Sequence, residues 1–239
     1  MKQTAHVKRM KAMKARPLKV AIVKDVLPNS LIIFGVMFLT LAYGPVVRDE
    51  AWYRLKELKH QVYKLNAEDG VEDSVFSRYL SASTVTLQPV NTDFSIVIEK
   101  LGVSAPIVRD VSVTDEDAYF AALHNGVAHA SVSPYPSESP GNVYLFAHSA
   151  VNFWELGQYA KVFNLARKLE VGDSIHVFYE NKDYVYEVVN KEVYKGWDTY
   201  PLTRSVIEPT LTLQTCDPPG TTLNRLVITA KLSKVNNVI

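Results

Sequence analysis

The feature that most constrains the fold is a series of seven segments after residue 92 in which apolar and polar residues tend to alternate. They are rich in Val, Ile, Tyr, Phe and Thr, and Gly, Pro, Asn and Asp separate them, which is typical of β-strands. Two of them form a hairpin around Glu180–Lys182, and two short helices are expected, at Glu116–Leu123 and Val151–Leu156. About eight strands with few helices predict a mainly β fold that closes into a barrel. The candidate strands are Phe94–Ile98, Ala105–Val108, Asn142–Ala147, Ser174–Tyr179, Asp183–Tyr194, Thr210–Thr215 and Leu226–Leu232.

The amino-terminal segment has a different composition. Eight Lys and Arg residues crowd the first 24 positions, and the run Val26–Val47 that follows contains no charge. About 20 residues at 1.5 Å each span a hydrocarbon core, and positive flanks stay in the cytoplasm. We therefore expect a single-pass plasma-membrane anchor at 26–47, with the amino terminus cytoplasmic and the remainder extracellular. A cleaved signal peptide is the competing interpretation, but Leu41–Pro45 fits a small-x-small cleavage site poorly.

The sequence thus divides into four parts: a basic arm (1–25), the anchor (26–47), a stalk and linker (48–92) and a barrel domain (93–239). Within the stalk, apolar residues at spacings of three and four predict an amphipathic helix over Ala51–Leu65. Asn66–Asn91 is rich in Ser, Thr, Asp and Glu and is interpreted as a spacer, with a short helix around Ser74–Leu80. The net charge of +1 gives no indication of a nucleic-acid partner.

The only cysteine of the chain, Cys216, ends one of the candidate strands. Because side chains alternate along a strand, Leu211 and Leu213 share one face and Cys216 lies on the other, away from the core. Arg225 begins the outward face of the next strand, and so short a connection favours antiparallel neighbours. The spacing therefore predicts that Cys216 and Arg225 meet at adjacent strand ends. The alternatives are an inert buried thiol and a solvated arginine at a strand edge.

A reactive cysteine needs a proton partner, since the thiolate is the nucleophile. Four of the six histidines fall in the barrel domain, and composition alone does not choose among them. His148 follows the strand Asn142–Ala147, where it is well placed to meet another strand end, or simply to cap its own strand. The other three are His124, His129 and His176.

Two segments carry a family resemblance. Thr212–Cys216 (TLQTC), followed nine residues later by Arg225, resembles the signature of the sortases, and Gly141–Ser149 (GNVYLFAHS) resembles their histidine segment. Ile96–Ile107 is similar to their first strands. The resemblance covers about residues 93–233, and the short loop between Cys216 and Arg225 is closer to the class D or E branches.

The resemblance implies a membrane-anchored cysteine transpeptidase, with Cys216 as nucleophile, His148 as acid/base partner and Arg225 stabilising the oxyanion. Such an enzyme cleaves an LPxTG-like sorting signal of a secreted protein through a thioester. It then joins the acyl group to an amine on a cell-wall peptide or a pilin lysine. Thr215 is a weaker candidate for oxyanion support, and Trp197 for lining the approach to the thiol.

No cofactor is expected, and the acidic residues at 110 and 115–117 lack the spacing of a known calcium loop. Another thiol acyl-transferase, of the L,D-transpeptidase type, would have glycine before the cysteine and arginine two residues after it. Thr215 and Pro218 stand at those places. The alternative from a different class is a catalytically silent, membrane-tethered β-barrel that serves as an adaptor in wall or pilus assembly.

Overall fold

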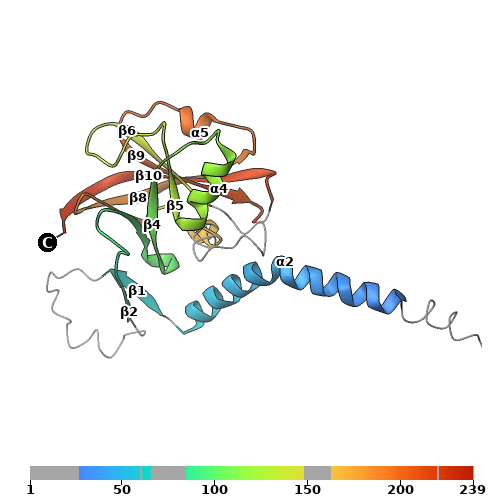
Figure 1. Cartoon of the computed structure of the whole chain (residues 1–239). Helices are drawn as coiled ribbons and strands as arrows, with labels where there is room; N and C mark the ends of the chain where they lie inside the picture. The colour runs from blue at the N-terminus through green and yellow to red at the C-terminus, as the bar shows by residue number, and fades with distance from the viewer. Residues whose placement is uncertain (1–26, 60, 66–83, 148–162, 220, 239) are drawn as a thin grey trace, which may run out of the picture. The chain divides into compact units, whose positions relative to one another are not determined.

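The computed structural model describes residues 27–59, 61–65, 84–147, 163–219 and 221–238. The described residues fall into two compact units, one ending at Leu41 and the other covering Ala42–Ile239. The expected helix Val151–Leu156, the short helix around Ser74–Leu80 and His148 lie outside the described residues. The second unit contains a closed barrel of eight strands (Figure 1), so the predicted mainly β barrel is confirmed.

Eight strands form the barrel in the order β10-β8-β7-β3-β4-β5-β6-β9. Two neighbouring pairs, β4–β5 and β6–β9, are parallel, and the other pairs are antiparallel. The strands are β3 (Phe94–Ile98), β4 (Val103–Val111), β5 (Val127–Ala130), β6 (Gly141–Phe146), β7 (Ser174–Tyr179), β8 (Lys182–Lys195), β9 (Pro209–Asp217) and β10 (Asn224–Asn237).

Short helical elements connect these strands. Asp115 caps helix α4 (Glu116–Asn125) by accepting a hydrogen bond from the backbone N–H of Ala118, as an acidic residue at this position commonly does. The β7–β8 hairpin turns through Glu180 and Asn181, both with positive φ (49° and 59°), which matches the twist of the flanking strands. The helical elements are η2 (Glu99–Leu101), α4 (Glu116–Asn125), η4 (Ala166–Lys168) and α5 (Tyr200–Thr203).

The core follows the alternation seen in the sequence. Leu211 and Leu213 are essentially inaccessible and pack with Leu145 inside the barrel. The sequence pattern missed β5, because all four of its residues are buried and no polar alternation marks it.

The region before the barrel differs from its prediction. A single helix, α2 (Leu27–Leu58), covers most of both the expected anchor and the expected stalk helix. The prediction that the stalk helix continues to Leu65 was wrong. Val62–Leu65 forms strand β1, which pairs in parallel with β2 (Thr84–Leu87). β1 has only four residues, and a sequence pattern this short does not distinguish a strand from the continuation of an amphipathic helix.

The end of α2 belongs to the second unit. Tyr53 is 4% exposed and lies in the main hydrophobic cluster, and the Lys56 ammonium donates to the carbonyl of Lys100. Glu50 forms ion pairs with Arg167 and Lys168 at η4. Among the described residues, no helix combines the length and the apolar content that crossing a membrane requires.

Candidate active site

The candidate site forms where β9 and β10 end side by side. Cys216 and Arg225 are direct partners in the antiparallel register, as their spacing predicted. A guanidinium nitrogen of Arg225, Nη1, lies 3.6 Å from the sulfur of Cys216. The thiol is only partly buried. The strand pairing alone therefore brings a potential nucleophile and a permanent cation together at an accessible place.

The outer face of β9 is open only near this end. Thr212 lies on the same face as Cys216, yet it is fully buried. Arg204, just beyond α5, donates 2.8 Å hydrogen bonds to the hydroxyls of both Thr212 and Thr229. The connection between β8 and β9 thus covers the middle of the strand, and the polar face predicted from the alternation reaches a pocket only from Gln214 onward.

Backbone carbonyls hold the guanidinium in place. Nη1 of Arg225 also approaches the carbonyl oxygens of Thr222 and Asn224, at 3.3 Å each. The loop that contains these carbonyls is itself fixed, because the N–H of Gly196 donates to the carbonyl of Leu223. A Cβ atom at Gly196 would lie 2.3 Å from the Thr222 oxygen, so glycine is what permits this close approach.

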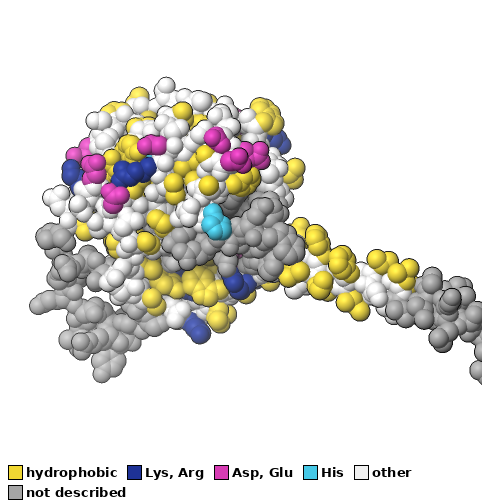
Figure 2. Space-filling view, in the orientation of Figure 1, with side chains coloured by type: hydrophobic (Ala, Val, Ile, Leu, Met, Phe, Trp, Pro, Cys, Tyr) yellow, Lys and Arg dark blue, Asp and Glu magenta, His cyan; other side chains and the backbone are white. Residues whose placement is uncertain are grey.

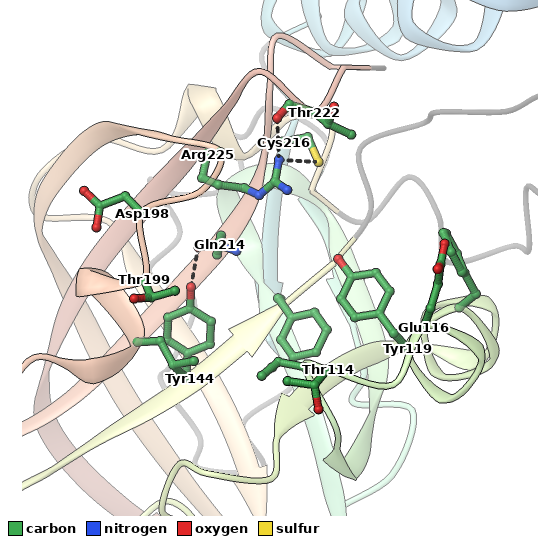
Figure 3. Close-up of a pocket in the computed structure, with 15 residues that line it drawn as sticks. Thr114, Glu116, Tyr119, Tyr144, Asp198, Thr199, Gln214, Cys216, Thr222 and Arg225 are labelled. Carbon is green, nitrogen blue, oxygen red and sulfur yellow. Dashed lines mark hydrogen bonds between the residues drawn. The ribbon is translucent and has the colours of Figure 1, made fainter.

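A pocket of about 550 Å³ opens beside the sulfur and is shown in Figure 3. Its residues come from α4 and the segment before it, from β6, β9 and β10 near their ends, from the β9–β10 loop and from the β8–β9 connection. Most of the wall is apolar or aromatic, as is usual for a ligand site with few polar groups. The lining residues are Val113, Thr114, Glu116, Tyr119, Phe120, Tyr144, Phe146, Gly196, Asp198, Thr199, Leu202, Gln214, Cys216, Thr222 and Arg225.

Two tyrosines contribute hydroxyl groups to this wall. The hydroxyl of Tyr144 donates to the side-chain oxygen of Gln214, and the ring of Tyr119 stacks on Phe146 with centroids 5.1 Å apart. Burial raises the pKa of Tyr119 to about 12, and it also raises the pKa of Tyr144. Both phenols therefore remain protonated near neutral pH and can donate hydrogen bonds.

The structure describes the positions of two of the three predicted catalytic residues. Cys216 and Arg225 are brought together, whereas His148 lies outside the described residues. The described chain leads up to it: β6 runs parallel to β9, and the N–H of Ala147 donates to the carbonyl of Gln214, two residues before Cys216.

The two weaker candidates lie apart from the pocket lining. Thr215 is 5% exposed on the face of β9 opposite to Cys216, and its hydroxyl has no hydrogen-bond partner among the described residues. Trp197 is 81% exposed, and its neighbours Gly196 and Asp198, rather than its own side chain, line the pocket.

His129 is held in a different environment. It is completely buried, with Nε2 3.0 Å from the Ser133 hydroxyl and 3.1 Å from the carbonyl of Pro134. Burial lowers its pKa, so the ring is neutral at pH 7. It is not among the residues that line the pocket beside the thiol.

The sequence analysis missed the aromatic wall. Tyr144 and Gln214 were identifiable in principle, because each lies on the outward face of a predicted strand that leads to His148 or Cys216. Tyr119 was not, because its distance from Cys216 depends on where α4 packs across the barrel. The spacing of residues in a single sequence does not indicate how α4 packs across the barrel.

The fold and the site together define the class of protein: a closed, eight-stranded β-barrel that carries a thiol and an arginine side by side where two of its strands end. Residues 96–233, more than half of the chain, match the family model described as the sortase domain. The chain therefore belongs to the sortase family. Comparison with curated protein sequences returned no match.

Several solved structures are similar to this chain. A sortase D5 transpeptidase of Clostridium perfringens is 27% identical, with 59% of this chain and 79% of that chain covered and a TM-score of 0.48. Sortase C1 of GBS pilus island 1 is 23% identical over 59% of this chain and 64% of that chain, with a TM-score of 0.50. Sortase C of Streptococcus pneumoniae is 20% identical over 59% and 68%, also with a TM-score of 0.50.

Proposed function

We propose that the protein is a cysteine transpeptidase that cleaves an LPxTG-like sorting signal and transfers the acyl group to an amine. The observation that carries the proposal is the 3.6 Å contact between Nη1 of Arg225 and the sulfur of Cys216, at the edge of an aromatic pocket. An unused thiol has no need of a guanidinium beside it. The pocket offers room for the apolar part of a peptide next to the sulfur.

Each of the three residues has one role in the proposed reaction. The Cys216 thiolate attacks the carbonyl carbon at the scissile bond, and the carbonyl oxygen becomes an oxyanion. Arg225, always charged and a multiple donor, stabilises that oxyanion more strongly than the neutral carbonyl. His148 gives a proton to the leaving amine as the thioester forms, and later takes one from the incoming amine.

The proposed acceptor is an amine on a cell-wall peptide or a pilin lysine, and the proposed donor is a secreted protein with a carboxyl-terminal sorting signal. We also propose that residues 26–47 anchor the protein in the plasma membrane. Two observations support the anchor: the basic arm before it, and the exposure of hydrophobic side chains on successive positions of α2. Hydrophobic side chains are visible along this helix in Figure 2. A helix that is apolar on all sides needs an apolar surrounding.

The test is an assay of the full chain in detergent against peptides that cover LPxTG-type signals, with glycine and lysine amines as acceptors. We expect mass spectrometry to detect cleavage, transfer and a thioester on Cys216. Cys216→Ala and His148→Ala should abolish cleavage with the thermal unfolding midpoint unchanged. Arg225→Lys, which keeps the charge but loses the planar fork, should lower kcat about 100-fold or more.

A matched control is Arg109→Lys, since Arg109 stacks over Phe94 and Tyr179 outside the pocket. This control should cleave at the wild-type rate. Undiminished cleavage by Cys216→Ala would refute the proposed function, and a wild-type protein that modifies none of the peptides would favour the adaptor instead.

A further inference from the structure

Tyr119 projects from α4 into the pocket beside the thiol. Figure 3 shows its hydroxyl directed toward Cys216 and Arg225, while its ring lies on the wall formed by β6 and α4. Tyr119 is thus a second polar group, from an element far from β9 and β10 in the sequence, that faces the same place as the guanidinium.

The direction of this hydroxyl is fixed by packing. The ring of Tyr119 lies nearly parallel to that of Phe146, with 11° between the planes, and meets Phe120 edge-on at 5.7 Å. Aromatic contacts on two sides restrict rotation of the ring, and a phenol oxygen lies in the ring plane. The donor is therefore oriented before any substrate arrives, which is the condition for useful stabilisation of a developing charge.

The protonation state suits a donor. The pKa of Tyr119 is raised to about 12, mainly by burial and also by the neighbouring Cys216 sulfur, while Arg225 opposes the shift. The phenol thus keeps its proton across the range in which an ordinary thiol, with a pKa of about 8.5, becomes a thiolate. It can therefore donate a hydrogen bond near neutral pH.

The hydroxyl of the other pocket phenol, Tyr144, points elsewhere. The hydroxyl of Tyr144 donates to the side-chain oxygen of Gln214, and Figure 3 shows it turned toward that residue. The hydroxyl directed at the sulfur and the guanidinium is that of Tyr119.

We propose that the hydroxyl of Tyr119 is a catalytic hydrogen-bond donor that shares the oxyanion with Arg225. As the bond between the Cys216 sulfur and the carbonyl carbon forms, the π-electron pair moves to the carbonyl oxygen, and Tyr119 donates to that oxygen without giving up its proton. When the intermediate collapses, the carbon–nitrogen bond breaks and His148 supplies the proton for the leaving amine. This inference rests on the proposed function.

The test compares wild type, Tyr119→Phe and Tyr179→Phe in the full chain, with a quenched fluorescent peptide that the wild type cleaves. Phenylalanine keeps the stacking on Phe146 and removes only the hydroxyl. We expect Tyr119→Phe to lower kcat about 10- to 100-fold with KM changed less than about threefold, because the lost bond forms in the transition state. Tyr179, on β7 and outside the pocket lining, is the matched control and should leave both constants unchanged.

A second measurement separates this role from an effect on the nucleophile. The rate at which iodoacetamide alkylates Cys216, followed against pH, reports the thiolate and needs no peptide. We expect the same profile for Tyr119→Phe and wild type. An unchanged kcat, a change confined to KM, or a shifted alkylation profile would each overturn the role of Tyr119 while leaving the proposed function standing. Failure of the wild type to cleave any peptide would overturn both.

Discussion

Gly196 determines how closely the end of β8 approaches the loop before Arg225. A Cβ atom there would meet the carbonyl oxygens of Thr222 and Leu223 at 2.3 and 3.1 Å. Both contacts are with backbone, so the loop itself would have to move, and the Thr222 carbonyl that accepts from Arg225 would move with it. Supporting contacts of this kind hold a catalytic group in its productive position.

We therefore expect Gly196→Ala to lower kcat for peptide cleavage about 10-fold or more while the fold survives. The control is Gly172→Ala. Gly172 has a φ of 94° and nothing near its Cβ direction, so alanine there should cost about 1 kcal/mol of stability through backbone strain. It should leave the cleavage rate intact. If Gly196→Ala cleaves at the wild-type rate, the loop does not position Arg225.

The roles of single residues were predictable only where a strand pattern placed them. Alternation along β9 was enough to separate Cys216 from Leu211 and Leu213, and the short loop was enough to set Arg225 opposite the cysteine. Thr215 shows the limit of a family signature. It precedes Cys216 in the sequence, but successive side chains of a strand point to opposite faces, so its side chain is directed away from the pocket and is buried.

The helix α2 and the short helix η4 are held together by charge. Glu50 on α2 accepts from Lys168 at 2.8 Å and from Arg167 at 3.2 Å, and it also accepts from Arg54 on its own helix. These hydrogen bonds, the one from Lys168 foremost, lower the pKa of Glu50 to about 2. Because the folded pKa lies below the unfolded value of 4.5, the contribution is fully present above about pH 4.5 and is lost as the pH falls toward 2.

We expect Glu50→Gln to reduce the free energy of unfolding by about 1–2 kcal/mol at pH 7, allowing for screening by solvent. The difference from wild type should shrink below pH 4.5. Urea denaturation followed by circular dichroism at a series of pH values measures it. Glu170→Gln is the control: Glu170 pairs with Lys100, but its side chain is 77% exposed, so the change should be near zero. A constant difference from pH 7 to pH 3 would contradict the assignment.

Among the secondary-structure elements, the hairpin β7–β8 was the easiest to predict, because its turn is local and two strong alternating runs flank it. The end of α2 was harder. Its helical pattern runs on in the sequence to Leu65, whereas the chain changes at Val62 to pair with β2, more than 20 residues later. A long-range pairing of this kind competes with local propensity and leaves no local signal.

For the molecule as a whole, the closed barrel was predictable as a class, but its strand order was not. The parallel pairing of β6 with β9 joins segments about 70 residues apart, and it is this pairing that brings the chain leading to His148 beside the strand of Cys216. Family resemblance supplied the histidine, which spacing alone did not select. Neither the family resemblance nor the spacing of residues predicted that α4 forms part of the pocket wall.

Attachment to a membrane is also a property of the whole chain. If residues 26–47 form an anchor, the full protein should sediment with membranes and resist extraction at alkaline pH, while a chain lacking residues 1–47 should be recovered in the supernatant. A matched variant with Ile32 and Phe38 both replaced by Lys should lose the association, because a charge in the hydrocarbon core is costly. Recovery of the full chain in the supernatant would contradict the anchor.

The position of β9 between β6 and β10 has a practical consequence. Both edges of the strand that carries the thiol are hydrogen-bonded, so the sulfur and the guanidinium cannot drift apart by fraying of a single free edge. Chemistry and barrel closure should then disappear in one cooperative step on heating. The rate at which the thiol reacts, measured at increasing temperature, would then report whether the whole barrel is intact.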